Sequence, residues 1–588
     1  KPWRGALWIC GQPALCARAY VDTAVDSAAA GRARSVLARP DNRRMTHIMV
    51  NVAWPYANGP RHIGHVAGFG VPSDVYARYQ RMKGNDVLMV SGTDEHGTPI
   101  LVEADKEGVT PQELADRYNR VIASDLCKLG LSYDLFTRTT TKNHELVVQE
   151  LFRQCLANGY IYKGSYDGWY CVPEETYFTD TQVRHADEER GTEGEHLCPD
   201  CGRPLQRVQE ESWFFKLSAF QDRLLELYRD NPRFVEPEIR RNEVVSFVEG
   251  GLKDLSISRT SFDWGIELPF DEGHVTYVWF DALINYLTAV GYGSDEAEFA
   301  YRWPAQAHLV GKDIIRFHCV IWPAMLMAAG LPVPEEVFAH GFLTVKNEET
   351  GATEKMSKSR GNVVSPATVV DLLGVDGYRY YFMTDVKPGT DGGISWGRME
   401  QVYNTDLANS WGNLVSRTLN MSAKYFDGRT PVMPEGWDTV ESPLSQVADG
   451  LVDRYLEAMY RFAYDEGAAA VMELVHAANR YIEDMEPWGL AKDPARADEL
   501  AFVIGSLVEA IRVSAHLLAP LMPSTSAEVL RRLSAEDEVG TRDLKAACAW
   551  GGFAQGASVT KGDALFPRLV AEGAAQKGDK AKAAKGGR

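Results

Sequence analysis

Between residues 46 and 97, hydrophobic positions fall into two short runs that each end in a polar cluster. "THIMVNVAW" (46–54) is followed by Pro55 and the Asn58-Gly59 pair, and "DVLMVSGTDEHG" (86–97) has the same arrangement. Continuous apolar runs of this length, bounded by turn residues, are typical of strands that are buried on both faces of a parallel sheet. We therefore predict two parallel strands with polar side chains at their carboxyl ends.

The segments after these runs have helical spacing. Residues 62–83 are predicted to form a helix that ends at Gly84, and Thr110 with Glu113 forms a capping box at the start of another helix. Apolar residues recur at helical spacing in that second helix: Leu114, Tyr118, Ile122 and Leu126. Strands that alternate with helices indicate an α/β fold with a parallel sheet.

The alternation stops near Gly159 and returns at "HVTYVWFDALINYL" (274–287) and "AHLVGKDIIRFHCVIWPAML" (307–326). The stretch between is rich in Gly, Tyr and Trp, so we predict an insertion that splits the sheet. From residue 401 the chain is predicted to be helical, and four apolar residues of 451–485 share one face: Leu451, Tyr455, Met459 and Phe462. The expected fold is a split Rossmann-like parallel sheet with an inserted connective domain, followed by an all-α helix bundle.

Seven segments follow from these patterns. They are an extension (1–44), the first half of the sheet domain (45–158), the inserted domain (159–264), the second half (265–340), a linking region with a basic loop (341–400), the helical domain (401–545) and a C-terminal tail (546–588). The Ala/Arg-rich extension is either a transit peptide or sequence upstream of a start at Met45, and we favour the second. The extension and the basic, low-complexity end of the tail are both predicted to be disordered.

Composition narrows the function classes. The formal net charge is −19, which argues against a protein that coats nucleic acid through a broad basic face, although local basic strips stay compatible with it. We find no apolar run as long as a membrane span, so no membrane association is expected. Nine scattered cysteines do not suggest a disulfide framework. We therefore expect a cytoplasmic protein.

Candidate chemistry gathers at the ends of the predicted strands, where open parallel sheets bind ligands. In "PYANGPRHIGHVAGFG" (55–70), His62 and His65 would lie on one side of a helix's first turn, and Gly64 would leave room for a flat ring. A helix N-terminus offers free N–H groups to phosphate, so the stretch predicts a nucleotide cradle. The alternative is a pair of surface histidines beside a Gly-rich turn.

A second stretch, "EKMSKSRGNVVSP" (354–366), places Lys355, Lys358 and Arg360 on a loop flanked by Gly and Ser. Alone it is better explained as a solvated basic loop. Together, His-Ile-Gly-His and Lys-Met-Ser-Lys-Ser resemble the class I aminoacyl-tRNA synthetases. The longer strings, "VAWPYANGPRHIGH", "SGTDEHGTPI", "YVWFDALINY" and "GKDIIRFHCVIWPAML", resemble the methionyl-tRNA synthetase family from about Met45 to about Leu533.

The resemblance implies that the chain joins methionine to ATP and transfers it to tRNA(Met), both initiator and elongator, with Mg²⁺ accompanying ATP. The implied catalytic and ATP-binding residues are His62, Gly64, His65, Gly311, Asp313, Lys355 and Lys358. Asp94 would hold the α-ammonium group of methionine. The methionine pocket would be walled by Ala53, Trp54, Tyr56, Trp279, Ala282, Tyr286, Ile314 and His318. For Trp279 and Tyr286 the alternative is a helix face in the core, and for Asp313 it is a structural helix cap.

Two pairs in the insert, Cys171-x-x-Glu174 and Cys198-x-x-Cys201, suggest a tetrahedral zinc site. The family's knuckle usually has Cys where Glu174 stands, so Glu174 is the expected fourth ligand. His185 and His196 are alternative ligands, and a site without metal is the remaining possibility.

The resemblance also implies that the helical region contacts the anticodon through Asn413, Arg417 and Trp488. Without the resemblance, a tryptophan beside a proline, such as Trp488, is more often a core residue at a helix end. We expect a monomer. Three other functions stay open: a synthetase for another apolar amino acid, a non-catalytic tRNA-binding protein, and a small-molecule nucleotidyltransferase.

Overall fold

The computed structural model describes residues 6–7, 19–20, 46–172, 174–178, 180–260, 262–346, 353–355, 364–436, 440–535 and 543–569. The chain divides into two compact units. The first comprises the residues up to Ala77 together with Asp86–Gly341, and the second comprises Arg78–Asn85 and the residues from Phe342 onward.

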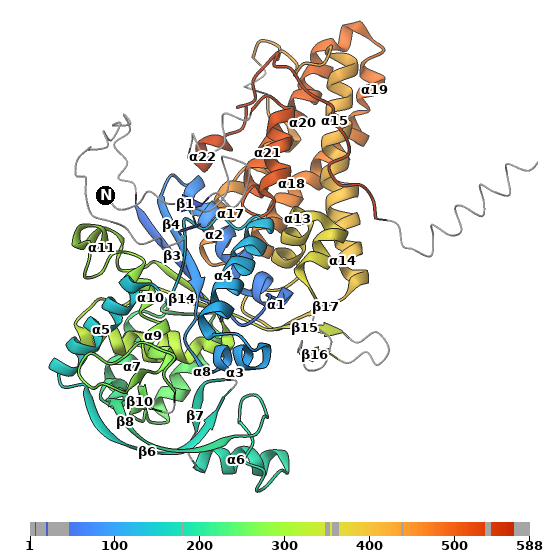
Figure 1. The fold of residues 1–588 in the computed structure, drawn as a ribbon. Coiled ribbons are helices and arrows are strands. Elements are labelled where there is room, and N and C mark those ends of the chain that lie inside the picture. The colour runs from blue at the N-terminus through green and yellow to red at the C-terminus, as the bar shows by residue number, and fades with distance from the viewer. Residues whose placement is uncertain are drawn as a thin grey trace, which may run out of the picture. The chain divides into compact units, whose positions relative to one another are not determined.

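The first unit is built on an eight-stranded sheet (Figure 1). Its strands, in spatial order, are β1 (Ala6–Leu7), β2 (Ala19–Tyr20), β5 (Leu135–Arg138), β4 (Asp86–Thr93), β3 (His47–Val52), β13 (Ala307–Gly311), β14 (Val337–His340) and β9 (Val235–Glu236). All neighbours from β2 to β9 pair in parallel, and β1 pairs with β2 in antiparallel fashion. The two predicted strands, β3 and β4, are confirmed as neighbours.

Most of the 1–44 extension lies outside the described residues, so the expectations about disorder and about the start at Met45 remain predictions. Within the extension, only β1 and β2 are described, and they form a hairpin at the edge of the sheet beside β5.

Parallel pairing brings the ends of three central strands to one edge of the sheet. β3 pairs with β4 from His47↔Asp86 to Asn51↔Val90, and it pairs with β13 from Val50↔Ala307 to Val52↔Leu309. The residues of β3 after His47 are all buried, as expected for a strand that is covered on both faces. The polar clusters that follow β3, β4 and β13 are therefore adjacent in space.

Helices cover this sheet and connect its strands. In chain order they are α1 (Ile63–His65), the π-helical turn η1 (Val66–Gly70), α2 (Val71–Met82), α3 (Thr98–Glu107), α4 (Pro111–Lys128), α5 (Lys142–Ala157), α7 (Gln221–Asp230), α8 (Glu238–Glu249), α9 (Val278–Ala282), α10 (Asn285–Thr288), α11 (Glu296–Arg302) and α12 (Trp322–Ala329). Short 3-10 or π turns precede α7 and α12: η2 (Leu217–Phe220), η3 (Lys312–Ile314) and η4 (Phe317–Ile321). The capping box of Thr110 and Glu113 is confirmed at the start of α4.

The insertion is a second, antiparallel sheet with the order β10-β8-β6-β7. Its strands are β6 (Ile161–Cys171), β7 (Thr176–Phe178), β8 (Gln206–Phe215) and β10 (Leu255–Ser256), and α6 (Asp180–Arg190) follows β7. The long β6–β8 pair curves along the lower edge of Figure 1. A further antiparallel pair joins β11 (Ser258–Arg259) to β12 (Val275–Thr276). The segment 159–264 is not wholly separate, because β9 within it forms an edge strand of the main sheet.

The second unit begins with a small sheet of β15 (Leu343–Lys346), β16 (Thr353–Lys355) and β17 (Gly392–Ile394). Helices make up most of the rest: α13 (Pro366–Thr384), α14 (Trp396–Val402), η6 (Tyr403–Trp411), α15 (Gly412–Tyr425), α16 (Pro443–Ala448), α17 (Leu451–Tyr460), α18 (Tyr464–Met485), α19 (Pro487–Leu490), η8 (Pro494–Arg496), α20 (Ala497–Leu518), α21 (Pro523–Arg532) and α22 (Leu544–Ala547). The helical region predicted from residue 401 is confirmed, whereas α13 was not predicted.

The apolar stripe predicted along 451–485 is confirmed, because all four of its residues are buried. The stretch forms two helices, α17 and α18, rather than one. Phe462 between them has a φ of 58°, a left-handed conformation that a continuous helix does not contain.

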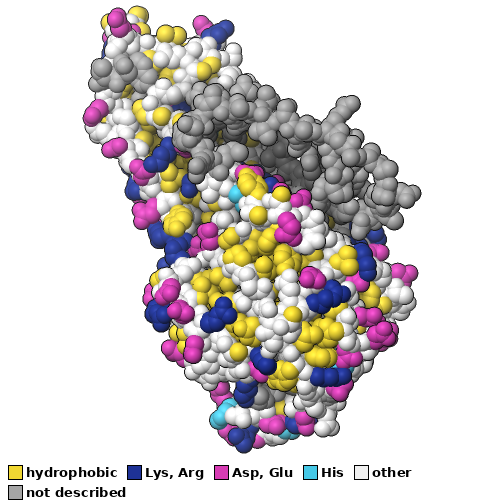
Figure 2. Space-filling model, turned by 90° about the vertical axis from the view of Figure 1, so that its left-hand side faces the viewer, with side chains coloured by type: hydrophobic (Ala, Val, Ile, Leu, Met, Phe, Trp, Pro, Cys, Tyr) yellow, Lys and Arg dark blue, Asp and Glu magenta, His cyan; other side chains and the backbone are white. Residues whose placement is uncertain are grey.

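One helical stretch of this unit, Pro494–Leu518, is long and apolar enough to cross a membrane, which corrects the expectation that no apolar run reaches that length. Its apolar window is 94% buried inside the protein, so burial accounts for its composition as a core helix. On the face shown in Figure 2, basic and acidic side chains of the described residues are interspersed.

A buried ion pair on α20 ties the chain's last described segment to the helical unit. The side chains of Glu509 and Arg512 are almost fully buried and bonded twice, at 2.6 and 2.9 Å. Glu509 also accepts hydrogen bonds from the backbone N–H groups of Gly552 (2.9 Å) and Phe553 (3.1 Å). Arg512 donates to the carbonyls of Ala547 and Ala549, so both charges are fully hydrogen-bonded.

Candidate active site

The candidate site lies where β3, β4 and β13 end. The residues that follow β3 and β4 form an isolated parallel bridge between Tyr56 and Asp94. The backbone N–H of Asp94 donates to Pro55 (3.0 Å), and the carbonyl of Asp94 accepts from Ala57 (3.0 Å). The backbone therefore holds two predicted site residues, Tyr56 and Asp94, next to each other.

Asp94 is a buried carboxylate with spare hydrogen-bonding capacity. Its residue is 2% exposed, and its Oδ1 has no hydrogen-bond partner. Burial raises the pKa of Asp94 well above its usual value, and the charges of Asp281, Glu175 and Glu95 raise it further. A buried acid without a cation is unfavourable, and a substrate ammonium group would relieve that cost. This environment fits the role expected for Asp94.

The predicted wall of the methionine pocket consists of aromatic and small side chains. Trp279 on α9 stacks on Phe317 of η4, with ring centroids 3.7 Å apart and an interplanar angle of 10°. The ring of Trp54 lies against Gly92 of β4, because a Cβ at position 92 would come within 2.7 Å of that ring. Three other predicted wall residues come from separate elements and are buried or half-buried: Ala53, Ala282 and Ile314. Phe317 was not predicted, although it is adjacent in sequence to the predicted His318.

His318 and Tyr286 form one hydrogen-bonded pair. His318 Nδ1 lies 3.1 Å from the carbonyl of Ile314, which can only accept, so Nδ1 carries the proton. Nε2 then accepts from the Tyr286 hydroxyl at 2.9 Å. Burial lowers the pKa of His318 to about 4, so the imidazole is neutral at pH 7. Tyr286 is 1% exposed, so it is both a core residue, as the alternative expected, and a partner of His318.

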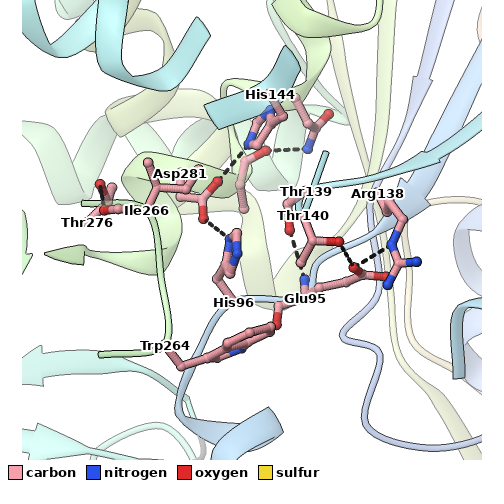
Figure 3. Close-up of polar contacts among 12 residues, drawn as sticks. Glu95, His96, Arg138, Thr139, Thr140, His144, Trp264, Ile266, Thr276 and Asp281 are labelled. Atoms are coloured by element: carbon pink, nitrogen blue, oxygen red, sulfur yellow. Dashed lines mark hydrogen bonds and ion pairs between the residues drawn. The ribbon is translucent and has the colours of Figure 1, made fainter. Parts of the chain in front are cut away.

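A buried carboxylate, Asp281, joins two elements that carry predicted site residues (Figure 3). Asp281 on α9 accepts from His96 Nδ1 and from His144 Nε2, both at 2.6 Å, and His144 Nδ1 lies 2.9 Å from the Thr288 hydroxyl. Burial by itself would raise the pKa of Asp281, but the two imidazoles outweigh it and lower that pKa to about 2. The network links the strand end that carries Asp94 to the helix that carries Trp279 and Ala282.

Glu95 follows Asp94 in the chain, and its side chain points away from His96 and toward Arg138 in Figure 3. Its carboxylate accepts from Arg138 Nε (2.7 Å) and from the Thr140 hydroxyl (2.5 Å), and its carbonyl accepts from Trp264 Nε1 (2.8 Å). These contacts fix Glu95, the residue that follows Asp94. The partners lie at least 43 positions from Glu95 in the sequence, which is why the sequence pattern did not reveal these contacts.

The two predicted histidines stand at the start of a helix, as expected. His62 is the N-cap of α1, and its Nδ1 accepts from the N–H of Gly64 at 3.1 Å. The rings of His62 and His65 lie 3.8 Å apart, both half-buried. Arg61 fixes the preceding turn by donating to the carbonyls of Tyr56 (2.8 Å) and Gly59 (2.6 Å).

The third strand end carries Gly311 and Asp313. A Cβ on Gly311 would lie 2.2 Å from Oδ1 of Asp313, so the absence of a side chain at 311 lets the Asp313 carboxylate fold back over the strand end. Asp313 is exposed in the 3-10 turn η3. Both its expected roles, ribose binding and helix capping, stay open.

The predicted basic loop belongs to the second unit. Lys355 is the last residue of β16, where it pairs with Thr344. Lys358 and Arg360 lie outside the described residues, so their expected role stays a prediction.

Three cysteines of the insert form a candidate metal site. The sulfur atoms of Cys171, Cys198 and Cys201 all lie within 4.8 Å of one another, and those of Cys171 and Cys201 are 3.6 Å apart. A hydrogen bond from Cys171, together with backbone N–H groups of Cys201 and Asp200, lowers the pKa of Cys198 to about 6. Three neighbouring thiols, of which that of Cys198 has a lowered pKa, are suitable ligands for zinc. Glu174 is exposed and is not part of this group among the described residues.

The two alternative histidine ligands are also outside that group. His185 is exposed on α6, and His196 stacks on Trp169 with ring centroids 4.3 Å apart.

In the helical unit, two of the three predicted anticodon residues lie on the same helix. Asn413 and Arg417 are one turn apart on α15, and both contact α18: Arg417 forms an ion pair with Glu483 at 2.6 Å, and Asn413 lies 3.5 Å from Asn479. Trp488 on α19 is 39% exposed, so the alternative of a core tryptophan is wrong.

Comparison with known proteins identifies relatives of both units. Residues 48–419 match the family model for "tRNA synthetases class I (M)", and residues 433–584 match the model for the "Anticodon binding domain of methionyl tRNA ligase". The chain is 44% identical to the methionine–tRNA ligase of Bacillus subtilis over 524 residues, which is 88% of this chain and 77% of that protein. It is 42% identical to the enzyme of the same name from Thermotoga maritima over 517 residues, 88% of this chain and 79% of that protein.

Solved structures agree with these relatives. The structure of Mycobacterium tuberculosis methionyl-tRNA synthetase in complex with methionyl-adenylate matches with a TM-score of 0.82 at 39% sequence identity. The match covers 89% of this chain and 100% of that one.

Proposed function

The chain belongs to the methionyl-tRNA synthetases of class I, and we propose that it activates methionine in the pocket around Asp94 and transfers it to tRNA(Met). It is a ligase that forms an aminoacyl-tRNA, with ATP converted to AMP and diphosphate. The observation that carries the site assignment is the buried Asp94 carboxylate, whose Oδ1 lacks a hydrogen-bond partner. Both initiator and elongator tRNA(Met) are proposed substrates.

Activation needs no general base, because the carboxylate of methionine is already a nucleophile. It attacks the α-phosphorus of magnesium-bound ATP and expels diphosphate, so catalysis consists of positioning and electrostatic stabilisation. We assign positioning of the ammonium group to Asp94 and phosphate contacts to His62, His65, Lys355 and Lys358. Gly64, Gly311 and Asp313 would accommodate the nucleoside. The neutral Tyr286–His318 pair would contact the thioether, which a purely apolar pocket distinguishes poorly from leucine.

Methionine-dependent exchange of pyrophosphate into ATP tests this assignment. Wild type should respond to methionine and not to leucine, isoleucine, valine or cysteine. Lys358→Ala should lower the exchange rate about 100-fold, the scale of losing one electrostatic stabiliser. Lys128→Ala, which removes an exposed lysine on α4, is the control and should change the rate by less than about twofold. Exchange with another amino acid would transfer the assignment to a different synthetase, and none at all would favour a non-catalytic protein.

We propose that the three cysteines hold a structural zinc ion with Glu174 as the fourth ligand. The support is the convergence of the three sulfur atoms and the lowered pKa of Cys198. Bound zinc would brace the insert by cross-linking β6 to the 198–201 turn.

Metal analysis by plasma emission spectrometry should find about one zinc per chain, the stoichiometry of one tetrahedral site. Cys198→Ser should remove most of it, and Glu174→Ala should lower the zinc retained against a chelator. Cys127→Ser, which changes a cysteine outside the group, is the control and should keep its zinc. Unchanged retention in Glu174→Ala would show that another group completes the site.

We propose further that Asn413, Arg417 and Trp488 contact the anticodon. Exposed Trp488 offers a ring for base stacking, and the Arg417 guanidinium is held on the surface by Glu483. The proposed state is a cytoplasmic monomer.

A further inference from the structure

Glu175, in the turn that follows β6, is a buried acid in an unfavourable backbone conformation. It is 1% exposed, and its φ of 46° lies in the left-handed region that non-glycine residues seldom adopt. Burying a carboxylate and holding this conformation both cost free energy, so the surrounding contacts must compensate. Nothing in the sequence pattern around Cys171 and Glu174 pointed to this residue.

The contacts of Glu175 lead directly to the pocket. The Tyr56 hydroxyl donates to Oε2 of Glu175, and the backbone N–H of Thr98 donates to Oε1 at 2.6 Å. The Tyr277 hydroxyl donates to the carbonyl of Glu175, which secures the turn. A Cβ on Gly97 would come within 2.8 Å of Oε1, so glycine at this position makes room for the carboxylate.

The bond to Glu175 decides the polarity of the Tyr56 hydroxyl. Because its single proton is donated to the carboxylate, the phenol oxygen can only accept hydrogen bonds from the pocket. Tyr56 is bridged to Asp94 through the backbone. Burial and the charge of Glu175 raise the pKa of Tyr56 well above its usual value, and the charge of Asp94 raises it further. The two groups therefore present acceptors in the same neighbourhood, which suits a substrate ammonium group with three N–H donors.

We propose that Glu175 is a positioning residue for methionine, which orients the Tyr56 hydroxyl as a second acceptor for the α-ammonium group beside Asp94. This inference rests on the proposed function. It gives the insert a part in substrate binding: a residue four positions after Cys171 sets the hydrogen-bonding polarity of a pocket wall that follows β3. The competing explanation is structural, namely that Glu175 only caps the first turn of α3 through Thr98.

Glu175→Gln separates these explanations. A glutamine can still accept from Thr98 through its carbonyl oxygen, so the cap on α3 is kept. Its NH₂ group donates to Tyr56, which turns the tyrosine proton toward the pocket and opposes the ammonium group. We expect the KM for methionine in pyrophosphate exchange to rise about 10-fold, the effect of one charge-assisted hydrogen bond, with the KM for ATP changed by less than about twofold.

The effect should depend on Tyr56. Tyr56→Phe should raise the KM for methionine to a similar extent, and adding Glu175→Gln to it should change the KM by less than about twofold, because contacting residues are not additive. Glu189→Ala, an exposed acid on α6 of the same insert, is the matched control and should behave as wild type.

Three outcomes would overturn the inference: a methionine KM near that of wild type in Glu175→Gln, an equal increase in the Tyr56→Phe background, or a near-normal KM in Tyr56→Phe alone. The Tyr56→Phe measurement tests the inference even if Glu175→Gln does not fold, because it removes the same hydrogen bond by changing the donor instead of the acceptor. Absence of methionine-dependent exchange in wild type would instead refute the proposed function, and this inference with it.

Discussion

Asp94→Asn is expected to lower kcat/KM for methionine in pyrophosphate exchange by about a thousandfold, equivalent to about 4 kcal/mol. The substitution keeps the size of the side chain but removes the charge that would pair with the ammonium group. Because Asp94 is 2% exposed, water cannot replace the lost interaction. Steady-state exchange kinetics with methionine as the varied substrate measure the effect.

The same substitution should stabilise the protein without substrate at neutral pH. The pKa of Asp94 is raised in the folded state, so ionising it opposes folding as pH rises above its unfolded value of about 4. Below that pH the acid is neutral in both states and the penalty is absent. The melting temperature of Asp94→Asn should therefore exceed that of wild type at pH 7, and the difference should shrink toward pH 4.

Asp125→Asn, which alters an exposed acid on α4, is the control for both measurements. Near-normal exchange in Asp94→Asn would remove Asp94 from the ammonium site. A lower melting temperature would show that its carboxylate has a stabilising partner in the folded protein.

Arg512→Leu is expected to destabilise the helical unit by about 3–5 kcal/mol, the usual cost of leaving a buried charge without its partner. Glu509 would stay buried, and the bonds from Arg512 to Ala547 and Ala549 would be lost. Differential scanning calorimetry should show a lower transition temperature for the part of the chain that contains α20. Proteolysis near residues 547–553 should become faster, because these residues lose their attachment.

Two further variants test the cause. Arg496→Leu breaks an exposed pair with Glu499 and should cost less than about 1 kcal/mol. The double variant Glu509→Leu/Arg512→Leu should be more stable than Arg512→Leu alone, because removing both charges removes the uncompensated one. If Arg512→Leu cost no more than Arg496→Leu, the buried pair would not be what holds the C-terminal segment.

The elements that the sequence predicted well are those with a local cause. β3 and β4 follow from uninterrupted apolar runs, and α4 begins where its capping box predicts. His62 is the N-cap of α1, and its side chain accepts from the N–H of Gly64 two residues later. The split between α17 and α18 was missed, because a single left-handed residue, Phe462, ends a helix without disturbing the apolar pattern.

The same distinction between local and distant causes applies to the candidate site. Two histidines, a polar residue at a strand end and a spaced set of cysteines are visible in the chain, and with them the resemblance that led to the family. Their partners are not visible. Phe317 against Trp279, His144 against Asp281 and Glu175 against Tyr56 are contacts between residues that are 38 to 137 positions apart.

The sequence by itself predicted β3 and β4, the capped start of α4, the insertion into the sheet and the helical region from residue 401, and its motifs led to the family. Only the tertiary structure decided which buried charges meet and which oxygen of Asp94 is left unpartnered. The physical reason is that local pattern reports whether a residue is buried, whereas a buried polar group must find a partner wherever the fold brings one within hydrogen-bond distance. That choice depends on how distant strands and loops pack, and no short stretch of this chain encodes it.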